Sequence, residues 1–233
     1  HGLFYHTIDD EKVARARQKM NQILDGSVTA SQDFVNYVRK EPAQHMIKGT
    51  KAIDLYKVEE QKIVVCPVGV NSSKCRKKKS VEKGQKLNCL ITGSLWFGPN
   101  ATGALWVLKE VMPKVSDICE LTIAGANPNN DITNACKETN TLLVASPESM
   151  KPYFEAADMV LVPIFDGGGM KVKVAEAMSY NLPIVTTSHG KIGYKIVDHE
   201  TGFIADNPND FAEKIREYWT MTPEKKDEFL DRE

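Results

Sequence analysis

Short apolar runs recur along the second half of the chain. Residues 87–92, 120–124, 141–145 and 159–164 are mostly apolar without a strict alternation, and a glycine or a polar turn follows each run. Such runs are typical of parallel strands that are buried on both faces. The pattern therefore predicts an α/β fold with a parallel sheet.

Segments with apolar residues at helical spacing lie between and after these runs. They are residues 101–115, where Pro113 is expected to bend or end the helix, 150–157, 170–180 and 209–219, with further short strands at 183–187 and 203–205. Alternating strands and helices are typical of a Rossmann-like sheet covered by helices on both faces. Ligands of such sheets bind beyond the carboxyl ends of the strands, so we expect the functional residues in the loops after the four apolar runs.

The first part of the chain is less regular. The elements expected there are helices at 9–25 and 31–39, strands at 27–30 and 63–66, and a basic, exposed stretch at 72–86. We place a domain boundary after residue 62. Residues 1–62 then hold the remnant of one α/β domain with a linker, and residues 63–233 form a second domain.

Composition narrows the functional classes. The 233 residues carry 30 basic and 31 acidic side chains, a balance that argues against a general nucleic-acid or membrane-surface binder. The longest fully apolar run, residues 159–165, is far shorter than the roughly 20 residues of a membrane-spanning helix. The five cysteines are odd in number and lack CxxC spacing, so we expect no zinc site and no disulfide framework, and a reducing cytoplasm as the setting.

Three glycines, Gly167, Gly168 and Gly169, lead into the helix expected at 170–180. Glycine lets the backbone approach a ligand closely, and the first turn of a helix presents unpaired N–H groups and the positive end of the helix dipole. Together these features form a seat for an anion such as phosphate. The alternative is a plain turn that enters a helix.

Lys173 and Glu176 favour the anion site, because they are three positions apart and project from one helix face. The ammonium group can neutralise a diphosphate, and the carboxylate can accept hydrogen bonds from the hydroxyls of a ribose. A surface ion pair is the alternative. Against it, Val172, Val174 and Ala175 surround the pair, and a mostly buried helix seldom carries Lys and Glu without a use.

Several common active-site motifs are absent from the sequence. The loop at 93–100 lacks the GxGxxG spacing of nicotinamide-binding domains, and the chain has no GxxxxGK[ST] P-loop, no GxSxG elbow and no HExxH zinc motif. A nicotinamide-binding domain and a P-loop nucleoside triphosphatase are therefore disfavoured.

A series of short motifs between residues 87 and 219 points to one family. The motifs are Gly93-Ser94-Leu95, Pro99-Asn100, residues 121–125 (LTIAG), Ala156-Ala157-Asp158, residues 167–177, residues 183–187 (PIVTT) and Thr201-Gly202-Phe203. In order and spacing they resemble the C-terminal, donor-binding domain of GT-B glycosyltransferases. The likeness is closest to the retaining group that includes glycogen and sucrose synthases and many bacterial polysaccharide enzymes.

The resemblance implies roles for individual residues. Glu176 matches the second glutamate of the family's E-x7-E motif, which binds the ribose, and Lys173 matches the lysine that contacts the diphosphate; we take both as the catalytic candidates. The other implied nucleotide-sugar contacts are Gly93 and Ser94 in the first phosphate loop, Ala145, Ser146 and Pro147 beside the base, and Gly168, Gly169, Met170 and Lys171 at the phosphates or the sugar.

This sequence departs from the family pattern at two positions. The first glutamate of E-x7-E falls at Gly168, which removes sugar recognition by that carboxylate. The arginine that usually follows the first strand is Ser94, which leaves Lys171 and Lys173 as the charge donors. The resemblance implies no metal and no other cofactor.

The family's complete enzymes also have an N-terminal, acceptor-binding domain of similar size. Residues 1–62 can supply only its last elements, and the chain begins with His1, not Met. We therefore expect that most of the domain lies outside this sequence or that the protein is a short natural variant.

The expected function is that of a hexosyl-type, retaining glycosyltransferase, or of its donor half. Its expected partners are a nucleotide-diphosphate sugar and a glycan, lipid-linked or protein acceptor, with peripheral membrane contact through the missing half. The expected location is the cytoplasm, at the inner face of the membrane. Two alternatives stay open: a nucleotide-binding or scaffold module without turnover, and a sugar-nucleotide epimerase on the same fold.

Overall fold

The computed structural model describes residues 28–30, 63–65 and 84–231. The chain divides into two units, of which the first holds residues 1–68, 167–170 and 192–194 and the second holds the rest. In the first unit, β1 (Val28–Ala30) and β2 (Ile63–Val65) pair in parallel. Both strands were predicted. The domain boundary predicted after residue 62 falls between these two paired strands, and its position remains a prediction. The helices expected at 9–25 and 31–39 lie outside the described residues.

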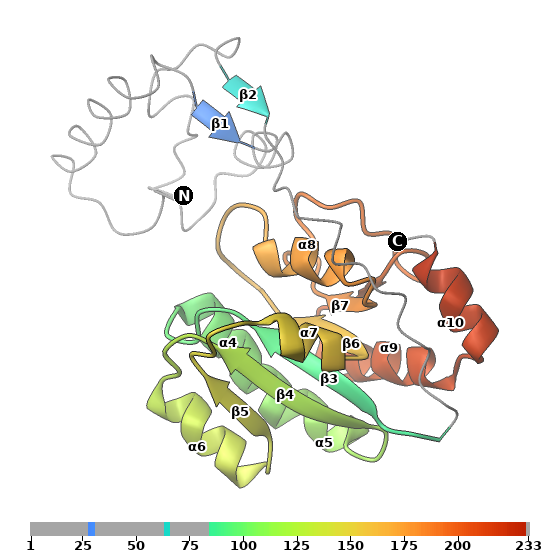
Figure 1. Cartoon of the computed structure of the whole chain (residues 1–233), viewed down its shortest axis with the longest axis horizontal. Helices are drawn as coiled ribbons and strands as arrows, with labels where there is room; N and C mark the ends of the chain where they lie inside the picture. Colours follow the sequence, from blue (N-terminus) through green and yellow to red (C-terminus); the bar gives the residue numbers. More distant parts are fainter. Residues whose placement is uncertain (1–27, 31–62, 66–83, 232–233) are drawn as a thin grey trace, which may run out of the picture. The chain divides into compact units, whose positions relative to one another are not determined.

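The second unit contains a six-stranded sheet in which all neighbouring strands are parallel (Figure 1). Its strands are β3 (Leu87–Thr92), β4 (Cys119–Gly125), β5 (Leu142–Ala145), β6 (Met159–Val162), β7 (Ile184–Thr186) and β8 (Phe203–Ile204). Their order is β5-β4-β3-β6-β7-β8, so the chain first builds one half of the sheet and then the other. This confirms the predicted α/β, Rossmann-like fold, and it places the topological switch between β3 and β6.

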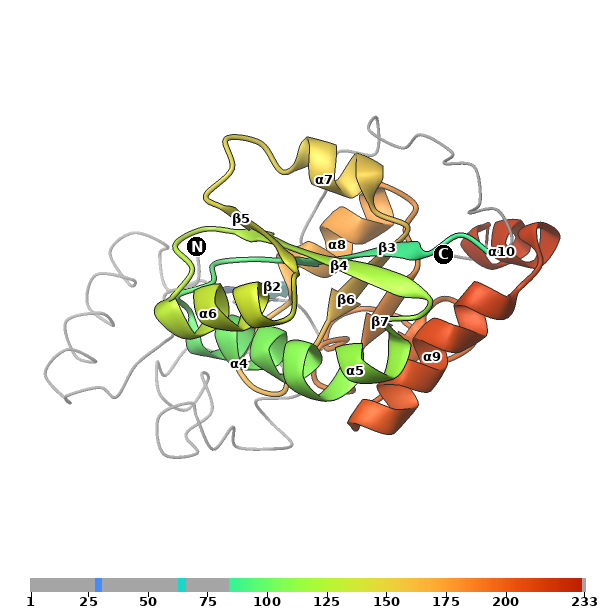
Figure 2. The same cartoon turned by 90° about the horizontal axis from the view of Figure 1, so that it is seen from below.

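Helices cover both faces of this sheet (Figure 2). One face carries α4 (Gly98–Trp106), η4 (Val107–Val111), α5 (Met112–Val115), α6 (Asn130–Glu138) and α9 (Pro208–Thr220), and the other carries α7 (Lys151–Ala156) and α8 (Val172–Ser179). The last helix, α10 (Pro223–Leu230), follows α9. None of these helices, in the described part of the chain, combines the length and apolar composition that crossing a bilayer requires.

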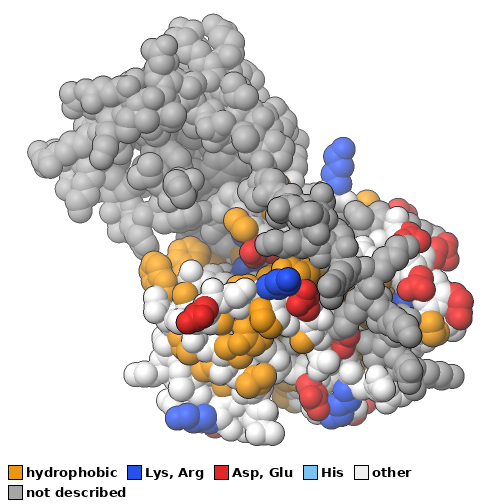
Figure 3. Space-filling view, viewed as in Figure 1, with side chains coloured by type: hydrophobic (Ala, Val, Ile, Leu, Met, Phe, Trp, Pro, Cys, Tyr) orange, Lys and Arg blue, Asp and Glu red, His pale blue; other side chains and the backbone are white. Residues whose placement is uncertain are grey.

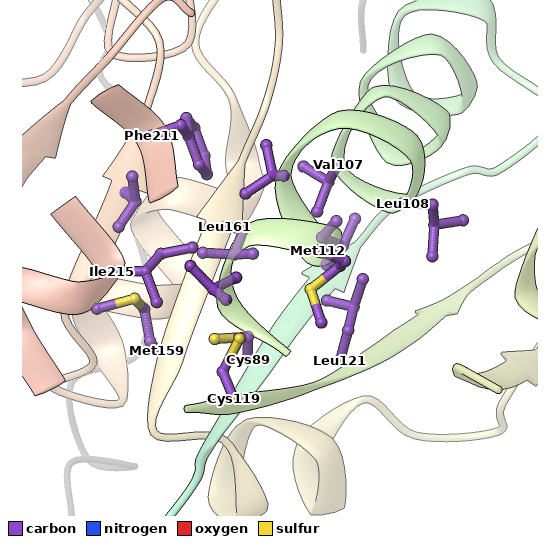
Figure 4. Close-up of a cluster of buried hydrophobic side chains, with 14 of the residues drawn as sticks. Cys89, Val107, Leu108, Met112, Cys119, Leu121, Met159, Leu161, Phe211 and Ile215 are labelled. Atoms are coloured by element: carbon purple, nitrogen blue, oxygen red, sulfur yellow. The ribbon is translucent and has the colours of Figure 1, made fainter. Parts of the chain in front are cut away.

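The main core lies between one face of the sheet and the helices that cover it, among them α5 and α9 (Figure 4). Cys89 and Leu121 from the sheet pack there against Leu108, Met112 and Ile215 from the helices, and all five side chains are buried. Burial of this apolar surface fixes the positions of the strand ends from which the functional loops start.

Pro113 does not end the helix that the sequence predicts over 101–115. The helix instead passes through the five-residue π segment η4, where the N–H of Met112 donates to the carbonyl oxygen of Val107. Proline has no N–H to donate, and the wider π turn accommodates it at the cost of one extra residue in the turn. The helix therefore continues to Val115.

Two further details differ from the sequence-based expectation. The helix α6 was not predicted; it begins after Asn129, whose side-chain oxygen accepts a hydrogen bond from the N–H of Ile132 at 2.9 Å. The helix expected over 170–180 begins two residues later, at Val172, and Lys171 occupies its N-cap position in an extended conformation.

Candidate functional site

The switch between β3 and β6 is where open α/β sheets bind their ligands. The two strands pair through Cys89 with Met159 and Leu90 with Val160. From β3 the chain continues into α4 on one face of the sheet, and from β6 it continues into α8 on the other (Figure 2). The carboxyl ends of these strands are therefore the place to look for functional side chains.

The loop from β3 to α4 is held in place by its backbone. Gly93 has φ 137°, in the region that favours glycine, and a Cβ on Gly125 would lie 1.8 Å from the Gly93 carbonyl oxygen. The N–H of Leu95 donates to the carbonyl oxygen of Ala126 at 2.7 Å, and the Leu95 side chain is buried in the core. These contacts leave Ser94 exposed at the end of the strand.

The start of α8 is tied to the loop after β3 through one side chain. Lys173 is buried, with 9% of its surface exposed, and its Nζ donates to the Asn100 Oδ1 at 2.8 Å. The Asn100 Nδ2 in turn donates to the Ser94 carbonyl oxygen at 3.0 Å. A Cβ on Gly93 would lie 2.9 Å from Lys173 Nζ. The structure thus brings together Gly93, Ser94 and Lys173, three of the residues that the sequence predicted.

The electrostatics of this cluster favour an anion. The pKa of Lys173 is lowered from its ordinary value to about 8, mainly by burial and also by the charge of Lys171, while the charge of Glu176 opposes the shift. Burial also lowers the pKa of Lys171 to about 8, against the opposing charge of Asp166. A bound anion would favour the charged form of both lysines.

Glu176 lies on α8, half-buried, within electrostatic reach of Lys173. The predicted pair is therefore brought together at the start of one helix, as its spacing requires. A carboxylate in this position can accept hydrogen bonds from hydroxyl groups of a ligand. Its role towards a ribose stays a prediction.

The glycine loop belongs to the first unit. Gly167 and Gly169 have φ values of 90° and 72°, which L-residues with side chains rarely adopt, and a Cβ on Gly169 would have no neighbour within 4 Å. Within the same unit, the Met170 side chain covers Gly193, where a Cβ would lie 2.4 Å from the Met170 Cγ. The roles of Gly168, Gly169 and Met170 at the phosphates stay predictions.

Ala145 is the last residue of β5, the edge strand of the sheet, and Ser146 and Pro147 follow it. Ser146 has φ 48°, its N–H donates to the Gly125 carbonyl oxygen at 2.8 Å, and its Oγ accepts from the N–H of Asn127 at 3.1 Å. The segment is thus tied to the loop after β4. Its predicted place beside a nucleotide base remains a prediction.

Two residues at the switch were not among the predicted site residues. In the sequence analysis Asn100 was named only as part of the Pro99-Asn100 motif. Its position at the start of the helix after the first predicted strand could have indicated a site residue. Thr92 ends β3 directly before Gly93, and its buried hydroxyl has no hydrogen-bond partner among the described residues. By contrast, Asp158 of the Ala-Ala-Asp motif is structural, because its Oδ2 accepts from the N–H of Asn88 at 2.8 Å at the opposite end of β3.

Residues 86–221 match the model of the family described as glycosyl transferases group 1. An uncharacterized 44.6 kDa protein in the cps region of Klebsiella pneumoniae is 31% identical over 144 residues, which are 56% of this chain and 37% of that protein. The chain thus spans little more than a third of this relative.

Three solved structures share the fold. A point mutant of S. aureus TarM in a complex that includes UDP has 15% identity and a TM-score of 0.66, over 98% of this chain and 44% of that chain. Anabaena HepE with UDP and glucose has 10% identity and a TM-score of 0.66, over 97% and 61%. The pneumococcal O-GlcNAc transferase GtfA with UDP and GlcNAc has 16% identity and a TM-score of 0.58, over 99% and 48%. Because the family model covers residues 86–221 of 233, more than half of the sequence, the chain belongs to the group 1 glycosyl transferases.

Proposed function

We propose that this chain binds a nucleotide-diphosphate sugar at the carboxyl ends of β3 and β6 and forms the donor half of a glycosyltransferase. The observation that carries the proposal is the buried ammonium of Lys173, held 2.8 Å from Asn100 Oδ1 at the topological switch. Membership of the family supports it. A buried cation with a lowered pKa is a frequent sign of a functional site.

In the proposed reaction a hexosyl group leaves the diphosphate. The bond from the anomeric carbon to the diphosphate oxygen breaks, a bond to an acceptor hydroxyl oxygen forms with retention of configuration, and the hydroxyl proton is released. Lys173 and the positive end of the α8 dipole stabilise the charge that develops on the departing diphosphate, with no metal in the step. Glu176 binds the ribose hydroxyls. The acceptor is a glycan, a lipid-linked sugar or a protein.

Uridine diphosphate is the first nucleotide to test, because the TarM, HepE and GtfA structures contain UDP. Isothermal titration calorimetry of the 233-residue chain with UDP, GDP and ADP should find one nucleotide that binds with a Kd below about 1 mM. Lys173→Ala should weaken that binding about 10- to 100-fold, since it removes a charge-assisted contact. The matched control is Lys137→Ala, an exposed lysine on α6, which should bind like the wild type. Absence of binding, or an unchanged Lys173→Ala, would refute the proposal.

A nucleotide-binding module without turnover is the second candidate. It is favoured by Gly168, which stands where the family pattern has its first glutamate. Incubation of the full-length protein with the sugar nucleotide that corresponds to the bound nucleotide separates the two: release of free nucleotide supports the transferase, and tight binding without release supports the module. The epimerase alternative gains no support from the family match and is not proposed.

A further inference from the structure

A side-chain hydrogen bond links the helix after β3 to the helix after β6 at the switch. Lys173 comes from the first turn of α8, after β6, and Asn100 comes from the first turn of α4, after β3. The two residues are 73 positions apart in the chain, and the bond from Lys173 Nζ to Asn100 Oδ1 measures 2.8 Å. The amide of Asn100 is therefore the group that fixes where the ammonium lies.

The orientation of this amide is itself fixed. Its Nδ2 donates to the carbonyl oxygen of Ser94 at 3.0 Å, which leaves Oδ1 directed to Lys173. A Cβ on Gly93 would lie 2.9 Å from both Asn100 Nδ2 and Lys173 Nζ, so the amide and the ammonium sit together over the Gly93 backbone. Glycine at this position gives both groups the space that they occupy.

The hydrogen-bond acceptor of Lys173 is the neutral amide of Asn100, so the positive charge of the ammonium is not cancelled by its partner. The charged groups that act on Lys173 are Lys171, which disfavours the ammonium, and Glu176, which favours it. An amide oxygen accepts a hydrogen bond from the ammonium without cancelling its charge, whereas a carboxylate at the same place would form an ion pair. The positive charge is thus held in place and left available to an anion.

We propose that Asn100 is a positioning residue, which holds the Lys173 ammonium beside Gly93 with its charge free to bind the diphosphate of the donor. The part that concerns the diphosphate rests on the function proposed above. The part that concerns Lys173 does not, and it can be measured in the free protein.

The first experiment is a pH titration of Lys173 by NMR in the 233-residue chain labelled with 13Cε-lysine, with the resonance assigned by Lys173→Met. In the wild type we expect the resonance to titrate near pH 8. Asn100→Asp should move the midpoint up by at least one pH unit, because a carboxylate favours the ammonium. Asn100→Ala should instead move it down, because the buried ammonium loses its hydrogen-bond acceptor. Asn134→Asp, at an exposed asparagine on α6, is the control and should change nothing.

The second experiment measures the affinity for UDP, and for inorganic pyrophosphate as the minimal probe, by calorimetry at pH 7 in the same variants. Asn100→Asp should weaken binding at least tenfold, and Asn100→Ala about tenfold, while the control binds like the wild type. Circular dichroism shows whether each variant folds, and Asn100→Ala carries the test if Asn100→Asp does not fold.

The outcomes separate the two proposals. If Lys173→Ala weakens binding but both Asn100 variants titrate and bind like the wild type, the role of Asn100 is overturned and the proposed function stands. If the Lys173 titration shifts as expected but neither UDP, GDP, ADP nor pyrophosphate binds the wild type, the positioning of Lys173 stands and the proposed function fails.

Discussion

Two lysines are buried in the described part of this protein, and their surroundings differ. Lys173 lies at the carboxyl end of the sheet, against the neutral amide of Asn100. Lys226, on α10, is 2% exposed and lies 5.2 Å from the centroid of the Tyr218 ring. Burial lowers the pKa of both lysines.

The protein supplies Lys226 with partners of its own. The charge of Asp158 opposes the lowering of its pKa, and the electron-rich face of Tyr218 attracts the ammonium. The same helix packs Phe229 on Phe203, with ring centroids 5.0 Å apart. Acidic side chains gather on the outer side of α10, where Glu224, Asp227 and Glu228 are exposed (Figure 3). Lys226 thus fastens the C-terminal helix to the domain.

The comparison teaches how a structural cation differs from a binding one. A cation that the fold uses for stability is paired with charge or with an aromatic ring from the protein itself. If Lys173 binds the diphosphate as proposed, its ammonium is held by a neutral acceptor and destabilises the fold until the ligand binds. The following predictions test this distinction.

The largest effect is expected from Lys226→Ala. Burial lowers the pKa of Lys226, so the expected loss comes from packing and not from its charge. Truncation removes the buried side chain beside Tyr218 and leaves a cavity, so the free energy of unfolding should fall by about 3 kcal/mol. Urea denaturation measures this change. The nucleotide affinity of the folded variant should equal that of the wild type. A loss of stability below about 1 kcal/mol would show that Lys226 does not fasten α10.

The opposite sign is expected from Lys173→Met. The pKa of Lys173 lies at about 8 in the folded protein and near 10.5 in the unfolded chain, so the ammonium destabilises the fold at pH 7. The variant should be more stable than the wild type by about 1 to 3 kcal/mol at pH 7, and this gain should shrink as the pH rises from 8 towards 10.5. Thermal and urea unfolding at pH 7 and pH 9.5 test both statements. A destabilised variant would place Lys173 with the structural lysines.

A smaller effect concerns the pH dependence of binding. Lys173 and Lys171 lose their protons as the pH rises through about 8. If the charged form of Lys173 binds the diphosphate, the Kd for the nucleotide should rise about tenfold between pH 7 and pH 9. Calorimetry over this range measures it, and Lys173→Ala should show a flatter profile. Equal steepness in the two proteins would contradict the assignment.

The smallest effect is expected from a chelator. If positive side chains and the helix dipole neutralise the diphosphate without a metal ion, EDTA should change the nucleotide affinity by less than about twofold. The control is a titration with added Mg²⁺, which should leave the affinity equally unchanged. A large loss on chelation would show that a cation shares the role proposed for Lys173.

The sequence alone predicted the sheet, and it indicated part of the cluster that the structure forms at the switch, whose role stays a prediction. The strand at 87–92 was placed on the residues that the structure assigns to it, because a buried parallel strand leaves an unbroken apolar run. Lys173 and Glu176 were found because both lie on one helix, where spacing determines which side chains share a face. Local periodicity was sufficient in these cases.

Local periodicity could not predict contacts between elements that lie far apart in the sequence. Asn100 meets Lys173 only because β3 and β6 are neighbours in the sheet, and no local pattern connects positions 73 residues apart. The helix α6 escaped prediction because its buried face consists only of Ile132, Ala135 and Cys136, too few apolar residues to stand out. Its cap at Asn129 was the better signal.

The π segment between α4 and α5 sets the angular phase of the helix that carries Asn100. Each residue advances an α-helix by about 100°, so one additional residue in the turn at Val107–Val111 rotates everything before it relative to the core-anchored end at Val115. Deleting one residue there would turn α4 by about 100° relative to Val115 and swing the Asn100 amide away from the ammonium. The direction in which the Asn100 side chain points thus depends on the π turn that accommodates Pro113, thirteen positions later.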